Sequence, residues 1–236
     1  MVYEIDIDKL KSSEESMEKL AYWIGVVQTD GCLSLYKETV QISFRVCEKS
    51  LPMLVKFNEF SYNLFGKKSN MWKEKTRDLF DYHFCVKSIL HIFERLGIRF
   101  GDPPKPPEWC LDDPALFGAY FAGVLDGDGC IWLTKPKDYK GLVCRAKVTS
   151  GSPQIDLQKA IKKFLNCQTR MIKVHTDGYI RGSKIIGDGY NLEFIISSKN
   201  HIFAKEFILP YLTISHKYQR LNMYIEYING HHGVNG

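Results

Sequence analysis

Two aspartates, Asp30 and Asp128, occupy the same position in two similar stretches of the chain. Each ends an apolar run with an internal glycine and precedes a Gly-Cys pair, in LAYWIGVVQTDGCL at 20–33 and LFGAYFAGVLDGDGCI at 116–131. Two carboxylates brought together repel each other, so a shared proton or a divalent cation must compensate. Carboxylate and water oxygens suit Mg²⁺ best. The pair therefore indicates a magnesium site if the two stretches lie side by side.

A metal ion held by two carboxylates suits phosphodiester hydrolysis. It can lower the pKa of a bound water, hold the attacking oxygen in line and stabilise the leaving oxygen. The sequence has no GxxxxGK[ST] loop, so we expect no nucleotide cofactor, and it has no His/Cys cluster that would bind zinc. A single helix that ends in Asp-Gly is commonplace, but the repetition of the whole pattern favours a functional pair.

The elements that must position the acids are two helices. The apolar run at 116–125 predicts a helix buried on all sides. Gly25 and Gly123 each cost a helix roughly 1 kcal/mol relative to Ala, which is explained if a second backbone comes very close, so we expect them to pack the helices together. Gly31 is expected to end the first helix at a position where a positive φ is tolerated. Helix C-termini carry partial negative charge, which favours a cation beside the acids.

The similarity of the two halves extends beyond these stretches. Both show the predicted order α-β-β-α-β-β-α, and Phe84 and Phe194 are among several matched residues spaced by 110 positions. We therefore predict an α+β fold of two pseudo-symmetric halves packed through the paired helices. The expected domains are an N-terminal arm (1–18), a first half (19–100), a linker (101–114) and a second half (115–236). In the second half, Asp177-Gly178 predicts a hairpin turn between strands at 170–176 and 179–186, and a last strand follows at 190–197.

The composition is that of a globular protein with a moderately basic body. The 236 residues are 44% hydrophobic and carry a net charge of +5, although the stretch 1–18 is acidic. This balance suggests a polyanionic partner. Seven cysteines without a CxxC pair indicate free thiols in a reducing compartment. We find neither an apolar run long enough to span a membrane nor a signal-peptide pattern, so we expect an intracellular, soluble protein without a membrane partner, in a prokaryotic cytoplasm or an organelle matrix.

The segments WIGVVQTDG (23–31) and FAGVLDGDG (121–129) resemble the two signature motifs of single-chain LAGLIDADG homing endonucleases. The first departs from the usual pattern at Trp23, Ile24 and Gln28. The resemblance implies a saddle-shaped monomer with two four-stranded antiparallel sheets that straddle double-stranded DNA. It also implies site-specific, Mg²⁺-dependent cleavage of a long asymmetric target with short 3′ overhangs, with Mn²⁺ able to substitute.

The resemblance assigns roles to individual residues as well. The family's metal-binding acids match Asp30 and Asp128, while Gln28 and Asp126 would support the active site. The family tends to place a lysine near each active centre, and Lys105 and Lys217 are the candidates here. Such a lysine could stabilise phosphate charge or help to activate water. An RNA maturase or a non-catalytic DNA-binding regulator on the same scaffold remains the alternative.

The polar faces of the predicted strands should supply the DNA contacts. Arg and Lys can read guanine edges or neutralise phosphates, and the sequence does not separate these roles from a plain solvated face. The residues nominated from the alternation are Gln41, Ser43, Arg45, Lys73, Lys75 and Arg77 in the first half, and Lys135, Arg145, Lys147, Thr149, Lys173 and Arg181 in the second.

Overall fold

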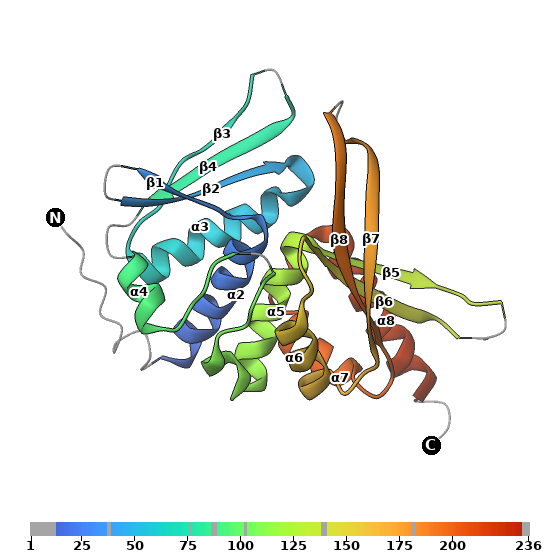
Figure 1. The fold of residues 1–236 in the computed structure, drawn as a ribbon. Coiled ribbons are helices and arrows are strands. Elements are labelled where there is room, and N and C mark those ends of the chain that lie inside the picture. The colour runs from blue at the N-terminus through green and yellow to red at the C-terminus, as the bar shows by residue number, and fades with distance from the viewer. Residues whose placement is uncertain are drawn as a thin grey trace.

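The computed structural model describes residues 13–36, 39–75, 77–85, 89–101, 103–137, 141–180 and 183–232. It confirms the α+β fold with two halves of like construction, each a four-stranded antiparallel sheet with helices on one face (Figure 1). The first half contains α2 (Glu14–Asp30), β1 (Cys32–Tyr36), β2 (Thr39–Cys47), α3 (Leu51–Phe65), β3 (Met71–Lys73), β4 (Leu79–Cys85) and α4 (Ile89–Arg95). The second contains α5 (Pro114–Asp128), β5 (Gly129–Thr134), β6 (Val143–Ser150), α6 (Ile155–Leu165), β7 (Thr169–Ile180), β8 (Ser183–Ile196), α7 (His201–Phe203) and α8 (Ser215–His232).

The two sheets have the same topology. Their strand orders are β1-β2-β4-β3 and β5-β6-β8-β7, antiparallel throughout. Alternate residues of β2, namely Ile42, Phe44 and Val46, are buried against the helices. The residues between them face away from the helices, as period-two alternation requires. The face of each sheet that is turned away from the helices is its outer face.

The helix ends follow from local chemistry. Ser13 caps α2 by accepting from the backbone N–H of Ser16, so the helix begins within the stretch expected to be an arm. The prediction of a positive φ at Gly31 is wrong, because this residue has φ −79° and ψ 132°. Its glycine is explained by crowding instead: a Cβ there would lie 2.5 Å from the carbonyl oxygen of Val27.

The second-half hairpin differs from the prediction. Asp177 and Gly178 lie inside β7, paired with Ile186 and Ile185. The predicted strands at 179–186 and 190–197 are largely one strand, β8, which pairs with β7 as far as Ser183. Asp-Gly is a strong turn signal only where the flanking strands end there, and here the backbone pairing of β7 with β8 continues past it. The resulting hairpin projects well beyond the body of the molecule (Figure 1).

Two further features were not assigned from the sequence. Strand β3 has only three residues, too few for a visible alternation, and α8 follows the repeated elements as an additional helix. None of the seven cysteines, all of which lie in the described part of the chain, forms a disulfide, as expected. In the part of the chain that the structure describes, no helix has the length and apolarity needed to cross a membrane.

Candidate functional site

Helices α2 and α5 pack against each other at Gly25 and Gly123. A Cβ on Gly25 would lie 2.3 Å from the carbonyl oxygen of Tyr120, and a Cβ on Gly123 would lie 2.3 Å from that of Tyr22. The contacts are reciprocal, since Tyr22 and Tyr120 hold the same position in the two motifs. Only glycine permits such a close approach of two backbones. The helices are therefore related by a local pseudo-twofold axis that passes between them.

Asp30 and Asp128 are the last residues of these two helices. Burial raises the pKa of Asp30; the charge of Asp126 acts in the same direction and that of Lys217 opposes it. No described side chain donates a hydrogen bond to Asp30 or forms an ion pair with it, so its oxygens remain available to a cation. The negative ends of two helix dipoles add to the attraction for positive charge at this point.

Lys217, the second predicted lysine, lies at the same place. Its ammonium donates to the carbonyl oxygens of Leu125 at 2.7 Å, Asp126 at 2.8 Å and Gly127 at 3.3 Å. It thus satisfies carbonyls that the end of α5 leaves without an intrahelical partner. Burial lowers the pKa of Lys217, and the charges of Asp126, Asp30, Cys130 and Asp128 oppose this decrease. One ammonium therefore acts electrostatically on both motif acids.

Lys105 has a different environment. Its ammonium forms an ion pair with Asp156 of α6 at 3.0 Å, and both side chains are close to half exposed. The main chain of Lys105, rather than its side chain, faces the motif helix: its N–H donates to Gln28 Oε1 at 3.2 Å, and its carbonyl accepts from Gln28 Nε2 at 3.0 Å. The structure therefore does not place the two candidate lysines equivalently.

Gln28 and Asp126 hold equivalent positions and accept equivalent hydrogen bonds, but only Gln28 also donates. Tyr120 donates to Gln28 at 2.7 Å, and Tyr22 donates to Asp126 at 2.8 Å, each across the helix interface. Gln28 also donates to the carbonyl of Arg99 at 2.6 Å. A carboxylate cannot donate, so this environment explains the amide at a position where the motif that this segment resembles commonly has an acid.

Asp126 is almost wholly buried and accepts several hydrogen bonds. Beyond Tyr22, it accepts from the backbone N–H of Thr213 at 2.9 Å, the hydroxyl of Thr213 at 2.7 Å and the N–H of Ile214 at 3.2 Å. These contacts fix the segment that leads into α8 and so position Lys217. The predicted supporting residues therefore anchor the segments that carry the two candidate lysines.

The first outer face carries Gln41, Ser43 and Arg45, as the alternation predicted. Arg45 lies between two acids: its Nε is 2.8 Å from Asp81, and its guanidinium is 3.2 Å from Glu74. Their hydrogen bond and charge raise the pKa of Arg45. The positive charge of this arginine is thus compensated within the protein.

Lys73 lies on the opposite face from the one expected of it. Its ammonium is 5.6 Å from the ring centre of Phe80 and 2.6 Å from Asp78, and Phe80 is directly opposite it in the sheet. The pleat places cross-strand partners on one face, so Lys73 points away from the outer face. Lys75 and Arg77 are exposed in the connection between β3 and β4.

The second outer face carries Arg145, Lys147 and Thr149, as predicted. Lys173 does not, because it pairs with Tyr190 and binds Asp188 at 2.6 Å on the other side of the hairpin. Lys135 is exposed just after β5. Arg181 lies outside the described residues.

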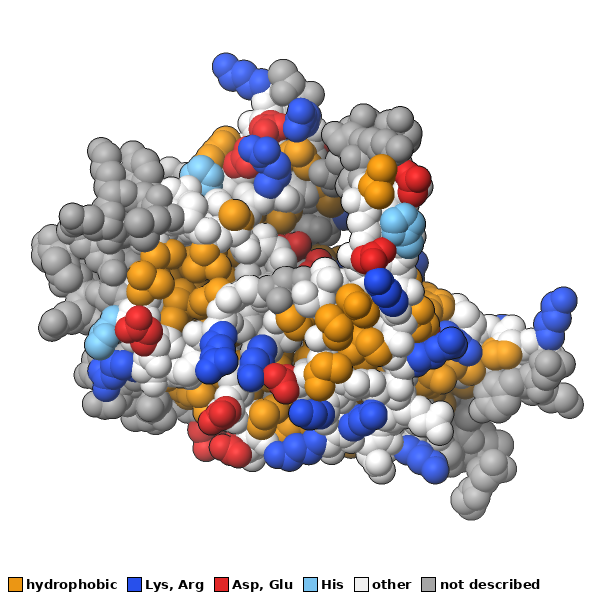
Figure 2. Space-filling model, in the orientation of Figure 1, with side chains coloured by type: hydrophobic (Ala, Val, Ile, Leu, Met, Phe, Trp, Pro, Cys, Tyr) orange, Lys and Arg blue, Asp and Glu red, His pale blue; other side chains and the backbone are white. Residues whose placement is uncertain are grey.

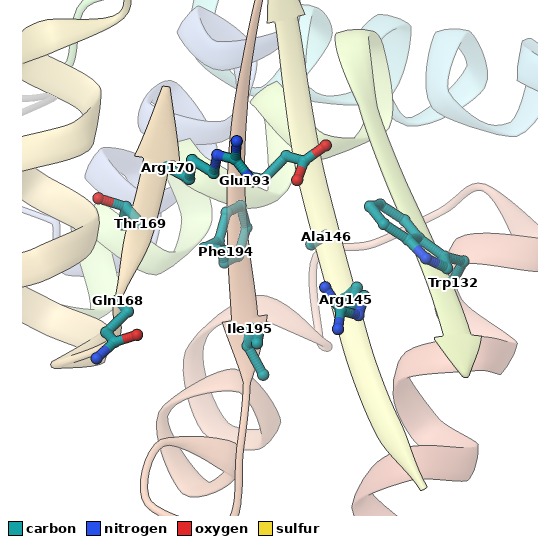
Figure 3. Close-up of a pocket in the computed structure, with 9 residues that line it drawn as sticks. All are labelled: Trp132, Arg145, Ala146, Gln168, Thr169, Arg170, Glu193, Phe194 and Ile195. Carbon is teal, nitrogen blue, oxygen red and sulfur yellow. The ribbon is translucent and has the colours of Figure 1, made fainter. Parts of the chain in front are cut away.

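Several outer-face residues were missed by the sequence reasoning. On the first sheet, Trp72 contacts His83 edge to face at 4.8 Å. On the second, Arg170 and Glu193 are cross-strand partners. The misplaced turn at 177–178 hid this register; once β7 and β8 are paired, alternation selects Arg170 instead of Lys173. Trp132 and Ile195 also belong to this group, and both line the depression in Figure 3.

The donor set at the helix ends suits a hydrated Mg²⁺ better than a metal held wholly by protein. Among the residues that the structure describes, no three His, Cys, Asp or Glu side chains gather into a metal-binding group. Mg²⁺ commonly uses one or two carboxylates and takes its other ligands from water and phosphates. Asp30 and Asp128 fit that pattern, since both offer oxygen at negative helix ends. Figure 2 shows a hollow between the two projecting hairpins with acidic side chains deep within it.

No protein-family model matches the sequence, and no curated protein matches it significantly. Solved structures do share its fold. A variant of the homing endonuclease I-DmoI, bound to its target DNA in the presence of magnesium, is 16% identical with a TM-score of 0.52 and covers 84% of this chain and 98% of its own. A structure from a study of mesophilic variants of I-DmoI is 14% identical with a TM-score of 0.50, and the match covers 81% of this chain and 96% of that one. Full-length DUF199/WhiA from Thermatoga maritima is 14% identical with a TM-score of 0.52, and the match covers 91% of this chain and 61% of that one. At these identities the likeness establishes the two-domain LAGLIDADG fold.

Proposed function

We propose that this protein is a site-specific, metal-dependent endonuclease that binds double-stranded DNA across its two outer sheet faces. The observation that carries the proposal is the reciprocal packing of Gly25 and Gly123. It brings together two helices that both end in an aspartate. An acid from each half, beside a pseudo-twofold axis, suits one cut in each strand of a duplex. Because both halves are in one chain, a monomer suffices, and the differing sheet faces match a long asymmetric target.

Asp30 and Asp128 would hold Mg²⁺ or Mn²⁺ together with water and DNA phosphate oxygens. When bound, the metal would supply a water of lowered pKa and stabilise the leaving oxygen. Lys217 has a role of its own: its fixed ammonium, close to both acids, limits their mutual repulsion and adds positive potential beside the scissile phosphate. Cleavage would leave short 3′ overhangs.

The DNA contacts would come from outer-face residues and from the hairpin tips. Uncharged groups such as Gln41 and Ser43 can bond to base edges, and Arg145 and Lys147 can bond to bases or phosphates. Thr149 donates to Asn191 at 2.9 Å, so these two side chains would act as a unit. Lys75, Arg77 and Lys135 are placed to reach flanking phosphates.

Cleavage-site selection tests this proposal directly. The protein is incubated with a randomised duplex library and Mg²⁺, cut ends are captured and sequenced, and parallel reactions contain EDTA or Mn²⁺. We expect double-strand breaks at one long sequence with Mg²⁺ or Mn²⁺ and none with EDTA. Absence of any selected break with either metal, from a protein that binds duplex DNA, would contradict the nuclease assignment.

A non-catalytic nucleic-acid-binding role on the same scaffold, as a DNA-binding regulator or RNA maturase, is the second candidate. The likeness in fold to full-length DUF199/WhiA supports it, because that neighbour is not described as a homing endonuclease. Under this alternative, the protein would bind duplex DNA or structured RNA with an affinity that is unchanged by EDTA, and the library would remain uncut.

A further inference from the structure

The strand registers define equivalent positions on the two outer faces. Gln41 pairs with Ser34 and Cys85, and Arg145 pairs with Trp132 and Ile195, at the same places in the two sheets. By the same registers, Ser43 corresponds to Lys147 and Arg45 to Thr149. The two faces therefore carry their charges at different positions.

The first outer face offers little net positive charge to a polyanion. Among the described side chains of these strands, Arg45 is the only Lys or Arg on this face, because Lys73 of β3 points to the other face. Arg45 is shared between Asp81 and Glu74. Apart from these acids, polar side chains of this face such as Gln41 and Ser43 are uncharged. A duplex phosphate that approached Arg45 would have to compete with two carboxylates already in contact with it.

The second outer face is cationic. Arg145 and Lys147 lie on β6 and Arg170 lies on β7, with β8 between these two strands, and none of the three forms an ion pair with another described residue. Glu193 is the single acid among the described side chains of this face. Figure 3 shows Arg170, Glu193, Arg145 and Trp132 distributed across the four strands.

Two observations argue that this cationic face binds a large ligand and that the charge difference between the halves lies in the sheets. The depression there has a volume of about 210 Å³, below the range of roughly 300–1,000 Å³ for small-molecule sites, so it fits the surface of a larger ligand. Among the described residues, the β3–β4 and β5–β6 connections each carry two exposed basic side chains, Lys75 and Arg77 in the first half and Lys135 and Lys137 in the second. The imbalance therefore resides in the sheet faces themselves.

We propose that the second outer face supplies most of the phosphate-neutralising contacts between the sheets and bound DNA, while the first contributes mainly uncharged contacts. This inference rests on the proposed function, since it presumes a duplex ligand. Counterion release makes the consequence measurable, because log K falls with log salt by about 0.9 for each phosphate neutralised.

The test is the salt dependence of binding to a generic duplex in EDTA, which separates binding from cutting. The triple variant Arg145→Ala/Lys147→Ala/Arg170→Ala is compared with Arg45→Ala and with Lys73→Ala, whose side chain lies on the other face. We expect the triple variant to flatten the slope by about 2–3 and to bind more than tenfold more weakly at about 0.1 M salt. Arg45→Ala should flatten it by less than any one of the three second-face single variants.

A slope that falls as much for Arg45→Ala as for single second-face variants, or a triple variant with the wild-type slope, would overturn the inference while leaving DNA binding intact. Wild-type protein that shows no salt-dependent duplex binding would overturn the proposed function together with it. If the triple variant does not fold, Arg170→Ala, which removes an exposed side chain, carries the same comparison.

Discussion

The hydroxyl of Tyr22 donates a 2.8 Å hydrogen bond to Asp126 across the interface of the two motif helices. Burial raises the pKa of Tyr22 well above its usual range, so the phenol remains a donor. The matching bond from Tyr120 to Gln28 completes a pair of buried links at equivalent positions. The pair joins helix packing to the placement of Lys105 and Lys217, because Gln28 and Asp126 each hold the backbone near one of these lysines.

Gln28→Glu should destabilise the fold even though the family commonly has an acid at this position. The new carboxylate oxygen would face the carbonyls of Arg99 and Lys105 that now accept from the amide. We expect a loss of about 1–3 kcal/mol in the free energy of unfolding, the usual cost of a buried unsatisfied group. Urea denaturation at pH 7 measures it. The reverse change, Asp126→Asn, should also cost stability, and wild-type stability of both variants would contradict the proposed contacts.

Gly25→Ala and Gly123→Ala should each weaken the helix interface. The added Cβ would meet a backbone carbonyl at 2.3 Å, and a backbone cannot move aside as a flexible side chain can. Overpacking of this kind costs about 1–3 kcal/mol or more. Gly230→Ala in α8 is the matched control, since its Cβ meets nothing within 4 Å and alanine favours a helix. Thermal unfolding that places all three variants together would show that the helices are not in close contact.

The two candidate lysines should respond differently to replacement by methionine. Lys217→Met removes a buried donor from three carbonyls at the end of α5, so we expect a loss of about 1–3 kcal/mol and much weaker DNA cleavage. Lys105→Met breaks an exposed ion pair, which is typically worth less than about 1 kcal/mol. Unfolding and cleavage assays on both variants provide the comparison. If Lys105→Met lost more cleavage than Lys217→Met, Lys105 would be the catalytic lysine, which would contradict this prediction.

Lys56 links the two halves and should make stability depend on alkaline pH. Its ammonium donates to the carbonyl of Tyr211 at 2.8 Å and lies over the rings of Tyr22 and Tyr211 at 5.0 and 5.1 Å. Burial lowers the pKa of Lys56 from 10.5 to about 8, with the charges of Asp126 and Glu59 opposing the decrease. Between these two pH values the unfolded chain binds more protons than the folded chain, so stability should rise with pH.

The expected rise has an upper bound of roughly 3–4 kcal/mol, from about 1.4 kcal/mol per pKa unit over the shift from 10.5 to about 8. Denaturant unfolding at several pH values from 7.5 to 10.5 measures it, and Lys56→Met isolates it from other titrating groups. The difference in unfolding free energy, wild type minus variant, should increase across this range. A flat difference would mean that the ammonium is not buried between the halves.

Much of the site was predictable because both motifs are local in sequence. The apolar runs, the internal glycines and the terminal acids specify two close-packed helices without knowledge of any distant contact. Alternation likewise placed Gln41, Ser43 and Arg45 on one face of β2. These features depend only on the period of a helix or a strand.

The remainder depends on pairings between distant segments. Lys73 and Lys173 were placed on the wrong face because the registers of β3 and β7 follow from β4 and β8 rather than from their own sequences. The ion pair of Lys105 with Asp156 joins the linker to the second half, and no short-range pattern encodes it. No short-range pattern encodes the acids that contact Arg45 either, because Glu74 and Asp81 are distant from it in sequence.

The most direct test of the account is cleavage of the selected target by wild type, Asp30→Asn and Asp128→Asn in Mg²⁺, with intact folding checked by thermal unfolding and DNA binding measured in EDTA. We predict that both variants bind the target but produce at most a small fraction of the wild-type double-strand breaks. Double-strand cleavage at the wild-type rate by either folded variant would contradict a nuclease centre built from these two helix-end aspartates.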